Sequence, residues 1–172
     1  MGWRYRLWQF GERLRASVCG VDERPAAAVL SPSALRLFRR MSPGDRQHAL
    51  QVLERLRAEG QWPNSVEQAA LLHDVGKSGA RLTLVHRAVV VLLPRLSPRA
   101  LERLAGAGTP SWRHPLYVQL HHAELGAALC AEAGCPPETV ALVRSHQSDE
   151  CVALEPEWRA AGAALHRADE RS

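Results

Sequence analysis

Aromatic residues are scarce in this sequence of 172 residues, and long apolar runs are missing from it. Phe, Trp and Tyr make up only 5% of the chain. Because β-sheets are rich in aromatic and β-branched side chains, this scarcity disfavours a β-sandwich. The longest apolar run covers residues 88–93, whereas a helix that crosses a bilayer needs about 20 apolar residues. The sequence therefore disfavours a membrane-spanning helix.

Cysteine is also sparse, and its spacing carries no metal-binding pattern. Cys19, Cys130, Cys135 and Cys151 form no C-x-x-C pair and lack the spacing of a zinc ribbon. The first residues of the chain are polar and charged, unlike the apolar core of a secretory signal. We therefore expect free thiols in a reducing, cytoplasmic compartment.

Lysine is nearly absent, because Lys77 is the only lysine among the 22 Lys and Arg residues. These basic residues outnumber the 18 Asp and Glu residues and give a net charge of +4. Arg and Glu are interspersed along the chain and form no dense basic tract. We therefore expect no stable binding of nucleic acid.

Ala, Leu and Arg, by contrast, are abundant, and all three favour helices. Apolar residues recur every three to four positions, which is typical of amphipathic helices. Ser42-Pro43 is a typical helix start, and Gly60 and Gly134 are typical stops. Asn64 or Ser65 is expected to cap the helix that follows Gly60. The pattern predicts an all-α fold with helices near residues 2–16, 33–41, 42–60, 64–74, 82–93, 97–105, 115–133, 137–147 and 156–169.

The chain is expected to have two parts. Residues 1–41 are predicted to form an N-terminal amphipathic helix, a loop with glycine and prolines at 16–32, and a short helix. Residues 42–172 are predicted to form the main domain. The helix at 2–16 carries Trp3 and Phe10 on its apolar face and arginines elsewhere. It is expected to pack on the domain, and it also suits contact with a membrane surface or a protein partner.

Histidine and aspartate residues recur on or beside the predicted inner faces of successive helices. They are His48, His73, Asp74, His122, His146 and Asp169. Burying imidazole and carboxylate groups together is costly unless a partner compensates them. A divalent metal ion is such a partner, because both groups are common ligands. Adjacent His73 and Asp74 can reach one ion from a helix end, and the second oxygen of Asp74 can bridge to another.

The order of these residues carries a family resemblance. Residues 71–77 read Leu-Leu-His-Asp-Val-Gly-Lys, residues 122–127 read His-Ala-Glu-Leu-Gly-Ala, and His-Gln and Ala-Asp follow at 146–147 and 168–169. Over residues 42–172 the chain resembles the HD-domain superfamily of metal-dependent phosphohydrolases. Its extra histidines make it similar to the subset that contains HD-GYP phosphodiesterases and bacterial diadenosine tetraphosphate hydrolases. No Gly-Tyr-Pro segment follows His122, which disfavours hydrolysis of cyclic di-GMP.

The resemblance implies an HD-domain helical bundle that binds two divalent ions, iron or manganese first, with magnesium, cobalt or nickel as alternatives. It implies that Asp74 bridges the two ions, and that Gly126 and Ala127 let the helix after His122 pack closely. His122 is favoured over His121 as a ligand by its spacing to Gly-Ala. The remaining implied ligands are His48, His73 and Asp169 for one ion and His122 and His146 for the other.

The resemblance also implies which residues would contact the substrate. Lys77 matches a family lysine that meets a substrate phosphate or supports the bridging aspartate, so Asp74 and Lys77 are the predicted catalytic residues. Arg81 and Arg144 lie near the motif ends and are candidates for binding a second phosphate.

The function implied is hydrolysis of a phosphate ester, in a nucleotide or related phosphorylated small molecule, by metal-activated hydroxide. Two alternatives stay open at this point. One is a metal-free helical signalling or protein-interaction module, although such a module is expected to have lost at least one ligand. The other is a di-iron oxygenase, because some HD-fold proteins oxidise substrates with the same ligand set.

Overall fold

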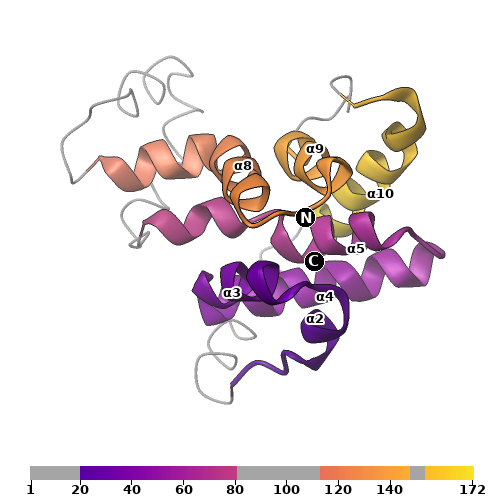
Figure 1. Cartoon of the computed structure of the whole chain (residues 1–172), viewed down its shortest axis with the longest axis horizontal. Helices are drawn as coiled ribbons and strands as arrows, with labels where there is room; N and C mark the ends of the chain where they lie inside the picture. The colour runs from indigo at the N-terminus through magenta and orange to yellow at the C-terminus, as the bar shows by residue number, and fades with distance from the viewer. Residues whose placement is uncertain (1–19, 81–112, 148–153) are drawn as a thin grey trace.

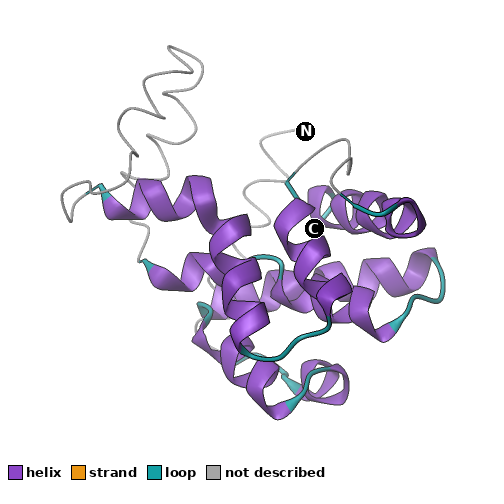
Figure 2. Cartoon of the chain, turned by 45° about the horizontal axis from the view of Figure 1, so that its top comes forward, coloured by secondary structure: helices purple, strands orange, loops and turns teal. Residues whose placement is uncertain are grey.

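The protein is helical throughout the part of the chain that the computed structural model describes, residues 20–80, 113–147 and 154–172. Within these ranges there are seven α-helices and two short 3-10 helices, joined by short loops, and no strand (Figures 1 and 2). This confirms the prediction of an all-α fold. The helices predicted at 2–16, 82–93 and 97–105 lie outside the described residues.

The helices follow the predicted order along the chain. Their bounds are Arg24–Val29 for α2, Pro32–Arg40 for α3, Pro43–Glu59 for α4, Asn64–Leu72 for α5, Val75–Gly79 for the 3-10 helix η1, His114–Glu132 for α8, Pro137–Ser145 for α9, Pro156–Trp158 for the 3-10 helix η2 and Arg159–Glu170 for α10. None of these helices is long and apolar enough to cross a bilayer.

Several helix ends form for the reasons that the sequence indicates. The Ser42 hydroxyl accepts a hydrogen bond from the Asp45 N–H at 3.2 Å and caps α4, and Pro43 fixes the first helical turn. At the end of α8, Gly134 adopts φ +74°, a left-handed conformation that glycine tolerates best. The N–H groups of Gly134 and Cys135 donate to the carbonyls of Ala131 and Cys130, both at 3.0 Å. This is the Schellman pattern of helix termination.

Two local predictions are wrong. The predicted linker at 16–32 contains α2, because Pro25 occupies the first turn of that helix, where its missing N–H is harmless. The helix α5 was expected to begin at an Asn64 or Ser65 cap. Instead Pro63 precedes its first residue, and no side chain caps it.

The helix α5 lies at the centre of the fold (Figure 1). It packs against α4, α9, α10, α2 and α3, and Val66 and residues 69–72 are fully buried. The helices α2 and α3 precede the predicted boundary at 41/42, yet they share this core through Ala26, Phe38 and Met41. The boundary itself stays a prediction. Because α5 is central, the His73-Asp74 pair that follows it lies in the interior of the protein.

Candidate metal centre

The six predicted ligands converge from five places in the helical fold, because His73 and Asp74 are neighbours in one turn. His48 lies inside α4, His73 and His146 directly follow α5 and α9, Asp74 precedes η1, His122 lies inside α8, and Asp169 lies in the last turn of α10. Their ligand atoms form two groups of three, and within each group all atoms lie within 4.8 Å of one another. This is the grouping that the sequence resemblance implies.

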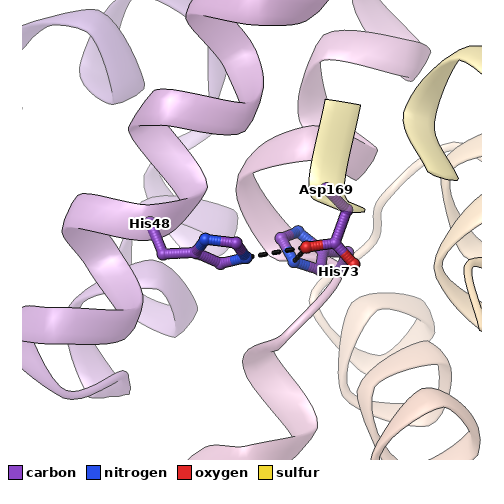
Figure 3. Close-up of side chains that lie close together, drawn as sticks. All are labelled: His48, His73 and Asp169. Carbon is purple, nitrogen blue, oxygen red and sulfur yellow. Dashed lines mark hydrogen bonds and ion pairs between the residues drawn. The ribbon is translucent and has the colours of Figure 1, made fainter. Parts of the chain in front are cut away.

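The outer group consists of His48, His73 and Asp169 (Figure 3). The Nε2 atom of His48 lies 2.8 Å from Oδ1 of Asp169, and Nε2 of His73 lies 3.6 Å from the same oxygen. Figure 3 shows the His48 ring pointing from α4 toward this carboxylate, with the His73 ring beside it. One carboxylate oxygen and two ring nitrogens thus point at a common position.

The inner group consists of Asp74, His122 and His146, all of which are buried. Oδ1 of Asp74 lies 3.3 Å from Nε2 of His122 and 3.9 Å from Nε2 of His146. Oδ2 of Asp74 lies 3.6 Å from Nε2 of His73, which belongs to the outer group. Asp74 therefore directs one oxygen to each group, as a bridging carboxylate must.

Three of the four histidines are oriented by the same backbone contact. The Nδ1 atoms of His73, His122 and His146 lie 2.9, 2.8 and 2.7 Å from the carbonyl oxygen of the residue three positions earlier. A carbonyl can only accept, so each Nδ1 carries the proton that it donates. The Nε2 atoms consequently face the centre of the cluster. Histidines that bind metals are typically held in this way by a hydrogen bond from the other ring nitrogen.

The buried ring nitrogen of His73 lacks a hydrogen-bond partner within the described residues. Its Nε2 atom is buried without any such partner, although two carboxylates lie 3.6 Å away. Burial by itself lowers the pKa of His73, but the charges of Asp74 and Asp169 outweigh it and raise this pKa to about 9. When only protein groups are present, the protonated His73 ring therefore neutralises part of the negative charge of Asp74 and Asp169.

The other buried ligands respond to the same charges. Burial alone raises the pKa of Asp74, but Lys77 and His73 hold it well below its usual range. Burial likewise opposes ionisation of Asp169, and His73 and His48 overcome it and lower its pKa. Burial and the positive His73 ring lower the pKa of His146 to about 4. The site thus holds two carboxylates and at least one neutral imidazole, the forms that bind metal ions.

This donor set fits a divalent ion in each group. Each group offers three protein ligands of nitrogen and oxygen type, which leaves coordination positions for water or substrate. The unpartnered Nε2 of His73 between two carboxylates is the atom that such an ion would satisfy. The structure therefore brings together a cluster able to hold metal ions.

The predicted substrate-contacting residues have different surroundings. The ammonium of Lys77 lies 2.6 Å from Oδ1 of Asp74, so it forms an ion pair with this carboxylate. Arg144 lies on the exposed side of α9, where its Nε donates to Glu124 at 3.0 Å, and its phosphate contact stays a prediction. Arg81 lies outside the described residues.

His121 is exposed and packs on Tyr117, with 4.5 Å between ring centroids, whereas His122 points into the inner group.

A close approach between η1 and α8 sets the distance between Asp74 and His122. A Cβ atom built on Gly76 would lie 2.0 Å from the His122 carbonyl oxygen and 2.7 Å from the Gly126 nitrogen. The predicted close packing at Gly126 is confirmed, because its own Cβ would lie 3.2 Å from the Gly76 nitrogen. The role of Gly76 is not readable from the sequence beyond its place in the motif.

His166 ties the end of α9 to α10. Its Nδ1 lies 3.1 Å from the His146 carbonyl oxygen, to which it donates. The hydrogen bond links the helix that ends at His146 with the helix that carries Asp169. The only sequence signal for this contact is the position of His166 one turn before Asp169.

Replacing His166 is expected to weaken the inner group without removing a ligand. His166→Ala should lower metal affinity about tenfold, because partners that orient ligands typically contribute at least this much. His166→Asn retains an N–H near the position of Nδ1 and should recover most of the affinity. Mn²⁺ titration in competition with a chelator measures the effect. Equal affinities of the Ala and Asn variants would contradict this role.

Comparisons with known proteins add no family assignment. None of the protein-family models, curated proteins and solved structures compared with this chain matches it. The resemblance to the HD-domain superfamily consequently rests on the motif residues alone.

Proposed function

We propose that this protein is a metal-dependent phosphohydrolase with two adjacent divalent ions. The observation that carries the proposal is the position of Asp74, whose two carboxylate oxygens face two separate groups of ligands. Two adjacent ions can stabilise both the attacking and the leaving oxygen in phosphoryl transfer, and a carboxylate that faces both groups suits such a pair. Iron and manganese are the proposed ions, with magnesium, cobalt or nickel as alternatives.

When bound, the ions supply a nucleophile from water at neutral pH and polarise a phosphoryl oxygen. The protein groups have distinct tasks around them. His48, His73 and Asp169 form one site, and His122 and His146 join Asp74 in the other. The backbone carbonyls behind three of the rings keep each Nε2 turned toward the centre.

Lys77 supplies positive charge beside the bridging carboxylate. Its ammonium is 2.6 Å from Asp74 and its side chain is 22% exposed, so it is open to a ligand at the surface of the site. A fixed cation there favours the charge that develops on a phosphoryl group during transfer. We propose a nucleotide or another phosphorylated small molecule as the substrate, with Asp74 and Lys77 as the catalytic residues.

The complete ligand set bears on the two alternatives. A metal-free interaction module has no need for six convergent ligands, whereas two groups of three are present here. A di-iron oxygenase uses the same donors, and only its oxygen consumption separates it from a hydrolase. The phosphohydrolase is favoured because Lys77 places a cation next to the centre.

Elemental analysis of protein purified without a histidine tag tests the proposal. We expect about two ions of iron or manganese per chain, and metal-dependent hydrolysis of bis(p-nitrophenyl) phosphate or of members of a nucleotide panel. Chelated protein, with and without added Mn²⁺, is the matched control. About one ion would indicate a mononuclear site, and no metal after reconstitution would favour the interaction module. Substrate-dependent oxygen uptake without phosphate release would favour the oxygenase.

A further inference from the structure

The turn between α8 and α9 brings two cysteines together, away from the six metal ligands. Cys130 lies in the last full turn of α8, and Cys135 follows the left-handed Gly134. The main-chain N–H of Cys135 donates to the carbonyl of Cys130 at 3.0 Å. This direct bond keeps the two residues within the Cα separation of about 7 Å that a disulfide allows.

The two thiols lie in different environments. Cys130 is fully buried in the core, whereas Cys135 is half-buried and packs against the edge of that core. The influence of each thiol on the other raises the pKa of Cys130, with burial acting in the same direction, and lowers the pKa of Cys135. Cys135 is therefore both the more accessible and the more easily ionised thiol, and thiolates are the nucleophiles in disulfide exchange.

We propose that Cys130 and Cys135 form a reversible dithiol–disulfide pair, oxidised through Cys135 by small-molecule disulfides such as oxidised glutathione. The proposal goes beyond the metal centre and does not depend on it. In reducing compartments, disulfides are typically transient and redox-sensing. The main-chain hydrogen bond between Cys130 and Cys135 already holds the pair within the separation that a disulfide allows.

The exchange occurs in two balanced steps. The Cys135 thiolate attacks one sulfur of oxidised glutathione, the S–S bond of glutathione breaks, and one glutathione leaves and takes up the proton that Cys135 lost. The Cys130 thiol then gives up its proton, and its sulfur attacks the Cys135 sulfur and releases the second glutathione. Two protein thiols are oxidised while one glutathione disulfide is reduced to two thiols.

The structure explains why the second step follows the first. The Cys135 charge is one of the causes that raise the pKa of Cys130. Once Cys135 is bound to glutathione it carries no charge, so this opposition to ionisation of Cys130 disappears. Cys130 lies behind Cys135 and is sealed from the solvent by the core. Cys135 is accordingly the entry point, and Cys130 resolves the mixed disulfide.

Folded protein at equilibrium with mixtures of oxidised and reduced glutathione tests the pair. Cys19→Ser and Cys151→Ser remove the two cysteines that lie outside the described residues. After an acid quench and alkylation with N-ethylmaleimide, mass spectrometry should show loss of both remaining thiols and no bound glutathione. Peptide mapping should recover a link between Cys130 and Cys135, and dithiothreitol should reverse it. If the double variant folds poorly, the same mapping applies to the natural chain.

Two matched variants separate the roles of the cysteines. Cys130→Ala should accumulate a stable glutathione adduct on Cys135, because no resolving thiol is left. Cys135→Ala should leave Cys130 unmodified for the same time, because Cys130 is buried. The proposal is overturned if both thiols remain free in oxidised glutathione, if the link forms only in denaturant, or if both single variants gain adducts at equal rates. Any of these results would reduce the pair to an ordinary packing contact of the helix end.

Discussion

Replacing Gly76 by alanine is expected to destabilise the protein strongly, although it adds only one methyl group. The new Cβ would lie 2.0 Å from the His122 carbonyl oxygen and 2.8 Å from its carbonyl carbon. These are backbone atoms of α8, so no side-chain rotation relieves the clash. Overpacking of a buried contact costs about 1–3 kcal/mol, and we expect the upper end of this range. Urea unfolding measures the loss in free energy of unfolding.

The same substitution should also remove bound metal, because η1 and α8 must move apart. Their separation carries Asp74 away from His122, which now lie 3.3 Å apart at their nearest ligand atoms. Gly79→Ala is the matched control in the same 3-10 helix, since its nearest neighbour is a flexible Val118 methyl at 4.0 Å. If Gly76→Ala were as stable and as metal-loaded as Gly79→Ala, the close approach would not determine the geometry of the site.

The second large effect is expected from Asp74→Asn, which preserves shape and removes charge. Within the described residues Asp74 alone directs ligand atoms to both groups, so its loss should prevent both ions from binding. Metal affinity should fall by more than about 100-fold, since even the groups that merely orient ligands contribute 10–100-fold. Hydrolysis should fall with it. Elemental analysis after buffer exchange gives the stoichiometry, and circular dichroism checks that helicity is retained.

Comparison of Asp169→Asn with Asp74→Asn distinguishes a bridging role of Asp74 from a general need of the site for negative charge. Asp169 belongs only to the outer group, so this variant should retain about one ion in the inner group, consistent with independent ligand sets of three. A bridging Asp74 is contradicted if the two variants have the same stoichiometry. Each substitution removes one negative charge, so a difference in metal content between the two variants cannot come from the net charge.

Much of the fold could be predicted because helix ends have local causes. Ser42 and Pro43 start α4, and Gly134 ends α8, through contacts within a few residues of each position. The sequence pattern does not predict the helix α2, because Pro25 indicates a loop unless the following residues are known to be packed. Its Ala26 and Val29 are buried against other segments, and such long-range packing leaves no local signal.

Some features of the site also have local causes in the sequence, whereas others depend on long-range packing. The motif order indicates the ligands, and helical spacing separates His122 from its neighbour. Successive residues on a helix point about 100° apart, so the packing of α8 on η1 decides which ring faces inward. The hydrogen bond of His166 to the His146 carbonyl and the clash at Gly76 depend on distances between helices that no sequence pattern contains.

The contact between His48 and Asp169 joins two positions that are 121 residues apart. An ion held by the outer group would tie α4 to the C-terminal helix α10 in the folded protein only, because its ligands do not converge in the unfolded chain. Binding of this kind stabilises only the native state, by an amount that grows with the free metal concentration. The lifetime of the protein against proteolysis would then follow the metal supply, so the amount of folded protein would fall when metal is scarce.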